Sequence, residues 1–339
     1  MRTKTTRLIP ILSLALLTGG VLAGQVAASA QELTGAGSTF INPVMQNWTA
    51  EYKKATGVAV NYQSIGSGGG IKALIDHTVD FAGSDAPMNE QELTEARAPV
   101  LHLPVVIGTE CIAYNIPGIG PGIHLTGPVI ADIYLGKIRY WDDRRIASLS
   151  PGTRFPHEAI FVAHRSDGSG TTYIFTDYLS KISPEWNTGV GTGKSVHWPV
   201  GLGGKGNEGV AGLIRTHPYS IGYIELAYAI QNVIPYAFVQ NARGKFIYPS
   251  MQSGSVAAAG VSIPPDMRVS ITNTSAPNGY PITGFSWLIV YRDSPKAAAL
   301  KRFLTWVLTT GQKYNAQLQY GAIPAPVRKR EMQMVASIK

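Results

Sequence analysis

Residues 159–181, AIFVAHRSDGSGTTYIFTDYLSK, contain the succession of predicted elements on which we base the prediction of the fold. Residues 159–164 form an apolar run of strand length, and the pattern of residues 171–181 indicates a helix. Between them stand Arg165 and a turn of small residues, 166–170. A strand, a glycine-rich turn and a helix in immediate succession are typical of α/β proteins.

The rest of the chain alternates short strand-like runs with helical runs, which extends the α/β prediction to the whole protein. We expect further strands at residues 57–63, 80–83, 100–115, 221–225 and 282–291. We expect further helices at residues 71–79, 89–98, 207–215, 226–231 and 295–310. No internal repeat and no long linker divides the chain into contiguous halves. If the protein has two lobes, we therefore expect the chain to cross between them more than once.

The first thirty residues have the pattern of a secretory signal. Arg2, Lys4 and Arg7 form a basic start, residues 8–22 form an apolar stretch, and residues 28–30 (ASA) are the small residues that a signal peptidase recognises. A membrane anchor is the alternative, but the apolar run is interrupted and shorter than the ~20 residues that span a bilayer. We predict cleavage after Ala30 and export to the periplasm. No cysteine follows the cleavage site, so we do not expect a lipoprotein.

The composition argues against several classes of function. The 339 residues are 45% hydrophobic and carry a formal net charge of +8, but the basic residues are scattered, so nucleic-acid binding is not expected. The single cysteine, Cys111, lies in an apolar run, and we expect a buried, inert thiol and no internal disulfide. The seven histidines show no metal-ligand spacing, so neither a metal nor another cofactor is predicted.

Three loops share one design, in which a strand ends, glycine and hydroxyl residues follow, and a helix begins. They are residues 35–40 (GAGSTF), 66–70 (GSGGG) and 167–171 (DGSGT). Free main-chain N–H groups and the helix dipole make such helix starts favourable for a small oxyanion. For Ser67 and Ser169 the alternative is an ordinary N-terminal cap. The presence of three such loops in one chain favours a shared anion site.

Two charged side chains add to this hypothesis. Arg165 ends a predicted strand four residues before Ser169, and its planar guanidinium can donate two parallel hydrogen bonds to an oxyanion, with Asp167 near enough to hold it. A carboxylate such as Asp85 repels an anion unless that anion keeps a proton for it to accept. Phosphate keeps one near neutral pH and sulfate does not. For Arg165 and Asp167 the alternative is an ion pair at the surface with little consequence. For Asp85 the alternative is a turn or capping residue.

These motifs resemble those of the periplasmic phosphate-binding proteins of bacterial phosphate ABC importers, the PstS family. The resemblance runs almost without gaps from Leu33 to Ala229, weakens over residues 230–280 and returns at residues 281–291. It is carried by the runs LTGAGSTF (33–40), VNYQSIGSGGG (60–70), VDFAGSDAP (79–87), ADIYLGKIRYWDD (131–143), RSDGSGTT (165–172), VGTGKSVHWPVGLGGKGNEG (190–209) and IGYIELAYA (221–229).

The resemblance implies a set of phosphate ligands: Thr39, Phe40, Ser67, Asp85, Arg165, Ser169, Gly170 and Thr171. Phe40 and Gly170 are expected to act through their main-chain N–H groups. Asp85 is expected to accept the phosphate proton, and Arg165 to supply the main positive charge, steadied by Asp167. Gly68 stands where some relatives have a second serine, which leaves this set unchanged.

The resemblance also implies a hinged protein of two lobes with phosphate in the cleft. We expect residues 31–108 and 283–339 in one lobe and residues 109–282 in the other. Such a receptor acts as a monomer and hands its ligand to the membrane permease of the importer. It is not an enzyme and needs no cofactor.

Two motifs suggest nucleotide binding but lack the required context. Residues 201–206 (GLGGKG) match G-x-G-x-x-G, yet Pro199 precedes them and the predicted helix begins only after Asn207. Residues 193–195 (GKS) would need a glycine at position 188, which is Thr188.

Three other functions stay open at this point. A phosphate-ester enzyme would need a metal cluster or an activated nucleophile, and near Ser169 the sequence offers only Arg165 and Asp167, which is a poor base system. A receptor for sulfate or molybdate is disfavoured by Asp85. An extracellular phosphate scavenger or adhesin without a transporter is the third.

Overall fold

A mixed sheet of eight strands, in the order β2-β1-β3-β11-β4-β8-β6-β7, runs through the protein. The structure is a computed structural model that describes residues 32–339 together with Met1 and Thr3, so the predicted secretory signal falls outside the described residues apart from those two. The strands are β1 (Leu33–Gly37), β2 (Val60–Ser64), β3 (Phe81–Ser84), β4 (Val100–Asn115), β6 (Phe161–Arg165), β7 (Leu202–Gly204), β8 (Ser220–Glu225) and β11 (Thr283–Tyr291).

Two groups of parallel strands flank an antiparallel centre. β1 pairs in parallel with β2 and β3 at one end, and β6 pairs in parallel with β7 and β8 at the other. The central strand β4 connects the two groups, because its residues 100–109 pair with β11 and its residues 110–115 pair with β8. Both contacts of β4 are antiparallel, and the strand is buried along almost its whole length.

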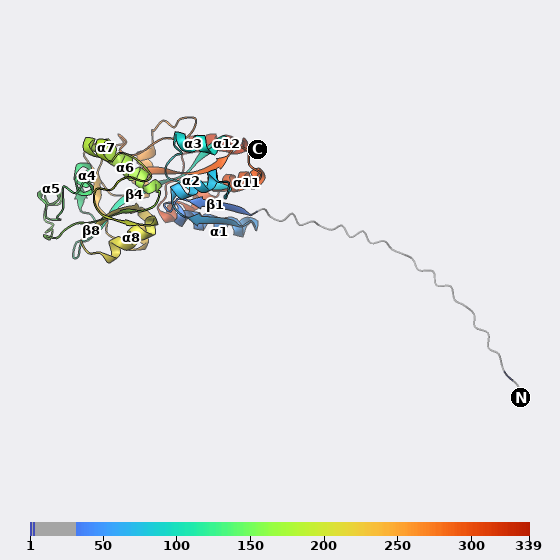
Figure 1. The fold of residues 1–339 in the computed structure, drawn as a ribbon, viewed down its shortest axis with the longest axis horizontal. Helices are drawn as coiled ribbons and strands as arrows, with labels where there is room; N and C mark the ends of the chain where they lie inside the picture. The colour runs from blue at the N-terminus through green and yellow to red at the C-terminus, as the bar shows by residue number, and fades with distance from the viewer. Residues whose placement is uncertain (2, 4–31) are drawn as a thin grey trace. The chain divides into compact units, whose positions relative to one another are not determined.

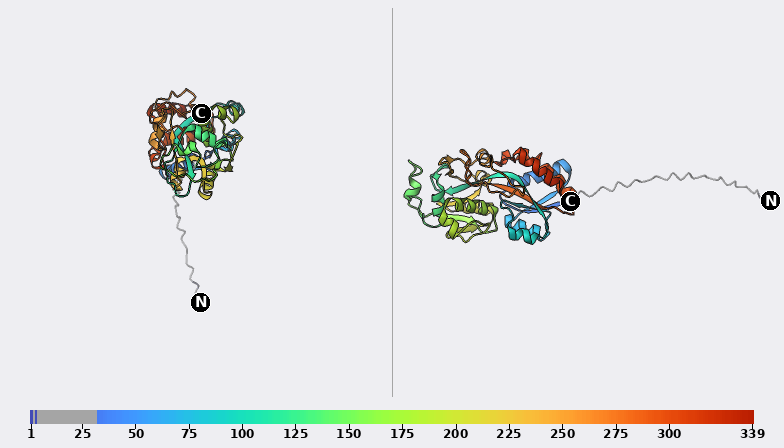
Figure 2. Two further views of the ribbon diagram at one scale, coloured as in Figure 1. Left: turned by 90° about the vertical axis from the view of Figure 1, so that its left-hand side faces the viewer. Right: turned by 90° about the horizontal axis from the view of Figure 1, so that it is seen from above.

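Helices cover the two ends of this sheet (Figures 1 and 2). Around one end lie α1 (Asn42–Thr56), α2 (Ser67–Ile75), α3 (Glu90–Ala96), α11 (Ala297–Leu308) and α12 (Ala325–Ala336). Around the other lie α4 (Gly127–Tyr134), α5 (Arg144–Ala147), α6 (Gly170–Ile182), α7 (Pro184–Gly189) and α8 (Gly206–Thr216). Within the described residues, no helix combines the length and apolarity that a membrane span requires.

The remaining elements include much of the region where the family resemblance is weak. They are the three-stranded sheet of β5 (His124–Leu125), β9 (Phe238–Gln240) and β10 (Phe246–Ile247), the helices α9 (Leu226–Gln231) and α10 (Met251–Ala258), and the short 3-10 helices η1 (Gly311–Tyr314) and η2 (Ala316–Leu318). α10 contacts both β4 and β11, so residues 230–280 contribute to the packing around the centre of the large sheet.

The predicted elements agree with the structure in position and type, with one informative error at α2. We predicted a helix at residues 71–79, whereas α2 runs from Ser67 to Ile75 and includes three glycines, 68–70. Glycine disfavours helices, but here a close chain approach requires it. A Cβ on Gly70 would lie 2.4 Å from the Cα of Gly37. The prediction of a buried thiol is also confirmed, since Cys111 is fully buried and burial raises its pKa.

Aromatic side chains fill the core at both ends of the sheet. In the first group Phe303 is fully buried, with its ring centroid 5.2 Å from that of Tyr52 and 5.5 Å from that of Phe81. In the second, the rings of Phe175 and Tyr223 are stacked at 4.3 Å. With a single cysteine in the whole sequence, this packing has to supply the stability of the fold.

Replacing Phe303 by Ala is expected to destabilise the protein by about 3–5 kcal/mol, because it removes a buried ring and leaves a cavity. Urea unfolding monitored by tryptophan fluorescence measures the change. Val256→Ala is the control: Val256 is 40% exposed on α10, and its truncation should stay within about 0.5 kcal/mol of the unchanged protein. Equal effects of the two substitutions would contradict this account of the core.

Candidate functional site

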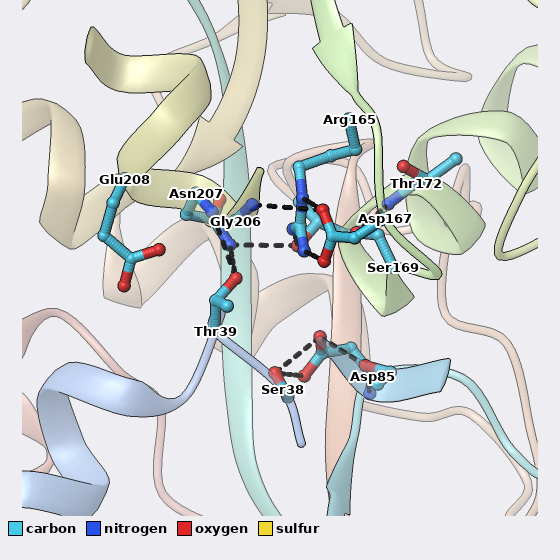
Figure 3. A network of polar contacts seen from close by, with 12 residues as sticks. Ser38, Thr39, Asp85, Arg165, Asp167, Ser169, Thr172, Gly206, Asn207 and Glu208 are labelled. Atoms are coloured by element: carbon cyan, nitrogen blue, oxygen red, sulfur yellow. Dashed lines mark hydrogen bonds and ion pairs between the residues drawn. The ribbon is translucent and has the colours of Figure 1, made fainter. Parts of the chain in front are cut away.

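The candidate site lies where the carboxyl ends of β1, β3 and β6 meet the N-terminal ends of α2 and α6 (Figure 3). In open α/β sheets this edge is where ligands bind, because loops and helix starts gather there. The three glycine and hydroxyl loops predicted from the sequence all reach it. Gly68 N donates to Gly168 O at 2.8 Å, so the second and third loops are in direct contact.

Asp85 lies at the bottom of this site and is only 2% exposed. Ser38 Oγ lies 2.6 and 2.7 Å from the two carboxylate oxygens, and Ser286 Oγ donates to Oδ1 at 2.7 Å. Ser67 Oγ lies 3.3 Å from Oδ2 and accepts from Asp85 N at 3.2 Å. Burial raises the pKa of Asp85 to about 6, although the hydroxyl donors and Arg165 act in the opposite direction.

Arg165 extends into the same space from the end of β6 and is 3% exposed. Its Nε donates to Asp167 Oδ1 at 2.8 Å, its Nη2 pairs with Asp167 Oδ2, and its Nη1 donates to Thr171 Oγ1 at 3.1 Å. Burial opposes ionisation of Asp167, but the bonds to Arg165 prevail and lower its pKa. A guanidinium held by an ionised carboxylate on one edge is fixed in orientation toward the site.

The two serines for which a capping role was the alternative differ in outcome. Ser169 is the N-cap of α6, since its Oγ accepts from Thr172 N at 3.0 Å. This use of one lone pair leaves the hydroxyl hydrogen available to a ligand. Ser67 caps nothing: it is the first residue of α2 and pairs with Asp85 instead. The capping interpretation is therefore right for Ser169 and wrong for Ser67.

Gly170 and Thr171 begin α6, where main-chain N–H groups have no partner within the helix. Gly170 also fits closely against the opposite loops. A Cβ at this position would lie 2.5 Å from Ser67 Oγ and 2.6 Å from Asp85 Cβ. The second loop, the third loop and the Asp85 turn therefore approach one another closely at this point.

Thr39 and Phe40 complete the set from the first loop, and both are held by residues that sequence reasoning missed. Thr39 Oγ1 accepts from Asn207 Nδ2 at 2.8 Å, and Thr39 O accepts from Tyr228 Oη at 2.7 Å. Phe40 O accepts from Tyr320 Oη at 2.6 Å, and that hydroxyl also lies 3.0 Å from Glu225 Oε2.

The structure thus joins six of the eight predicted residues through contacts, namely Thr39, Ser67, Asp85, Arg165, Gly170 and Thr171. Phe40 and Ser169 are their neighbours along the chain, and Asp167 holds Arg165. The structure adds three groups to the site: Ser38 and Ser286, which hold Asp85, and Asn207, which holds Thr39. Ser38 belongs to the quoted first loop and could have been chosen by its hydroxyl alone. Asn207 directly follows the G-x-G-x-x-G match, so the glycine motif precedes a residue of this candidate site. Ser286 lies inside a buried strand and carried no signal.

Comparison with known proteins shows the family of the chain. A model of the PBP superfamily domain matches residues 23–310. Phosphate-binding protein PstS of Xylella fastidiosa (strain Temecula1) is 44% identical over 305 residues, covering 88% of this chain and 83% of that protein. The PstS protein of Pasteurella multocida is 43% identical, and the match covers 93% of this chain and 93% of that protein. The PstS protein of Methanocaldococcus jannaschii is 38% identical, and the match covers 98% of this chain and 93% of that protein.

Solved structures share the fold at lower sequence identity. A high-affinity periplasmic phosphate-binding protein (PfluDING) superposes with a TM-score of 0.73 at 21% identity, covering 89% of this chain and 93% of that one. A phosphate-binding protein from Stenotrophomonas maltophilia gives 0.68 at 18% identity, covering 90% and 94%. The protein therefore has the two-lobe α/β fold of the periplasmic binding proteins, as the sequence predicted. The chain belongs to the PstS family of the PBP superfamily.

Proposed function

We propose that the protein is a receptor that binds inorganic phosphate between its two lobes and delivers it to an ABC-type importer in the membrane. The observation that carries the proposal is the convergence of one buried acceptor, Asp85, and the guanidinium of Arg165 in a region rich in hydroxyl and N–H donors. The relatives named as phosphate-binding proteins support the same ligand.

The ligands in this proposal are Thr39, Phe40, Ser67, Asp85, Arg165, Ser169, Gly170 and Thr171. Phe40 and Gly170 would donate through their main-chain N–H groups, the latter with the positive end of the α6 dipole behind it. Hydrogen bonds to a charged partner contribute about 1.5–3 kcal/mol each, and micromolar binding requires about −8.2 kcal/mol. Several such bonds therefore suffice without apolar burial of the ligand.

Asp85 would select the ligand by its proton. Near neutral pH phosphate retains a hydrogen that the carboxylate can accept, whereas sulfate has none and leaves two negative charges facing each other. Burial already raises the pKa of this carboxyl group to about 6, which shows that an ionised Asp85 lacks solvation and benefits from a donor. A protonated phosphate oxygen is such a donor.

The two lobes in the proposal are residues 31–108 with 283–339, and residues 109–282. The change of partner along β4 between residues 109 and 110 supports this division. Thr39, Phe40, Ser67 and Asp85 then come from the first lobe, and Arg165 and residues 169–171 from the second. A ligand that contacts both lobes stabilises the closed form over the open one, and the closed form is what a permease would recognise.

The cellular setting belongs to the proposal as well. A secretory signal at residues 1–30 would deliver the protein to the periplasm as a monomer. The receptor would work without a cofactor and without chemistry on its ligand. Its partners would be inorganic phosphate and the importer's permease.

Titration of the ligand-stripped protein with phosphate should show one binding site per chain. Arg165→Ala should weaken the phosphate affinity about 10-fold or more, which corresponds to the loss of one charge-assisted hydrogen bond. Isothermal calorimetry at constant ionic strength measures both. Arg243→Ala is the matched control, because Arg243 is exposed and its side chain bonds only to Ser275 O. Wild-type affinity in Arg165→Ala would show that the site is misassigned.

Asp85→Asn should narrow the preference for phosphate over sulfate, since an uncharged amide does not repel a fully ionised anion. The pH dependence tests the same group. Below pH about 6 the empty wild-type carboxyl carries its own proton and loses its acceptor role. The ratio of wild-type to Asp85→Asn affinity should therefore fall as pH drops through 6, while phosphate speciation is common to both. A flat ratio between pH 5 and 8 would exclude this role of Asp85.

Gly170→Ala should weaken phosphate binding at least 10-fold, because the added Cβ would lie 2.7 Å or less from Ser67 and Asp85 and hold the loops apart. Gly212→Ala is the control: a Cβ at Gly212, on α8, meets nothing within 4 Å. Small-angle scattering with saturating phosphate should show the Gly170 variant more extended than the control. Identical affinity and dimensions would argue against closure at this contact.

A further inference from the structure

Asn207, in the first turn of α8, is fully buried and has every polar atom of its side chain paired. Nδ2 donates to Thr39 Oγ1 at 2.8 Å and to Thr171 Oγ1 at 3.1 Å, and the main-chain N–H donates to Thr39 Oγ1 at 3.1 Å. Oδ1 accepts from Glu225 N at 2.9 Å. A main-chain N–H can only donate, so this last bond fixes which way the amide faces.

The contacts of Asn207 determine what the two threonine hydroxyls can still do. A hydroxyl has two lone pairs and one hydrogen. Thr39 Oγ1 accepts twice from Asn207, and Thr171 Oγ1 accepts from Asn207 and from Arg165 Nη1 at 3.1 Å. Both lone pairs are occupied in each case. Each hydroxyl therefore has only its hydrogen left to offer.

We propose that Asn207 is a positioning residue that holds the hydroxyls of Thr39 and Thr171 as donors toward the bound anion. The inference rests on the proposed function, and it extends that function by naming a residue that acts without touching the ligand. It also separates the site into a side that donates hydrogen bonds, at the two threonines, and a side that accepts one, at Asp85. On the threonine side the pocket can only donate, so the one oxygen of the ligand that carries hydrogen must face Asp85.

Asn207 also links parts of the chain that the proposed lobes separate. Thr39 follows β1 and Thr171 lies in α6, yet one amide nitrogen contacts both hydroxyls, as Figure 3 shows for Thr39. Removing the amide would free lone pairs on both threonines, and each hydroxyl could then turn its hydrogen away from the ligand. Affinity would fall even though every proposed phosphate ligand is still present.

A double-mutant cycle tests this route of action. Phosphate affinity is measured by calorimetry at pH 8 for the wild type, Asn207→Ala, the Thr39→Val/Thr171→Val pair, and the triple variant. We expect Asn207→Ala to weaken binding about 10-fold in the wild-type background, the scale of one hydrogen bond to a charged group. In the valine background, where no hydroxyl is left to position, the same substitution should change affinity less than about 2-fold.

Asn241→Ala is the matched control, because Asn241 is also a buried asparagine, bonded to main-chain groups at Ala276, Pro277 and Gly279. It should lower the thermal unfolding temperature without changing phosphate affinity. Asn207→Asp keeps the shape of the side chain and serves if Asn207→Ala does not fold. Its carboxylate cannot donate to the threonines and should weaken binding more than 10-fold. Because its charge also repels the anion directly, only the part of this loss that disappears in the valine background passes through the threonines.

The outcomes separate the inference from the function on which it rests. A wild type that does not bind phosphate would overturn the proposed function. A wild type that binds, combined with an equal effect of Asn207→Ala in both backgrounds, would overturn the inference alone, because the effect would then not pass through the threonines. Loss of the effect in the valine background supports it.

Discussion

The burial of one carboxylate, Asp85, places the strictest demand on this structure. An ionised carboxyl group without solvent or partners is costly, and here the hydroxyls of Ser38, Ser67 and Ser286 replace water around it. These serines come from the loop after β1, the start of α2 and the middle of β11. The sheet order β1-β3-β11 is what brings them to one point. The same order leaves the carboxylate facing Arg165.

Arg165 is constrained in a complementary way. Asp167 takes two of its N–H groups and also accepts from Gly206 N at 3.0 Å, so a single carboxylate fixes both the guanidinium and the start of α8. Asn207 is the next residue of α8, and it holds the hydroxyls of Thr39 and Thr171. The orientation of the guanidinium and that of the threonine hydroxyls therefore both depend on contacts made at the start of α8. Arg165, Asp167 and Asn207 lie in the same proposed lobe, so this half of the site would keep its arrangement whether the lobes are open or closed, which reduces the ordering that binding requires.

The sequence predicted what depends on local patterns. Strand, glycine turn and helix follow one another within a few residues, so the α/β fold and the three loops could be identified directly. Contacts between distant segments could not. Ser286 looks like any strand residue, and Asn207 looks like a helix start; only the fold brings them to Asp85 and Thr39. The start of α2 was mispredicted for the same reason. Glycine at position 70 is required by the close approach of the neighbouring loop at Gly37, which helix propensity does not reveal.

The contact of Tyr320 with both Phe40 O and Glu225 Oε2 has an electrostatic consequence. A phenol has one hydrogen, so Tyr320 shares it between the carbonyl oxygen of Phe40 and the carboxyl group of Glu225, and the first loop is thereby coupled to a buried acid. Burial raises the pKa of Glu225, and likewise that of Glu110, which faces it across β4 and β8. A raised pKa shifts each of these acids toward its uncharged form. Their burial thereby lessens the repulsion that an incoming anion would meet.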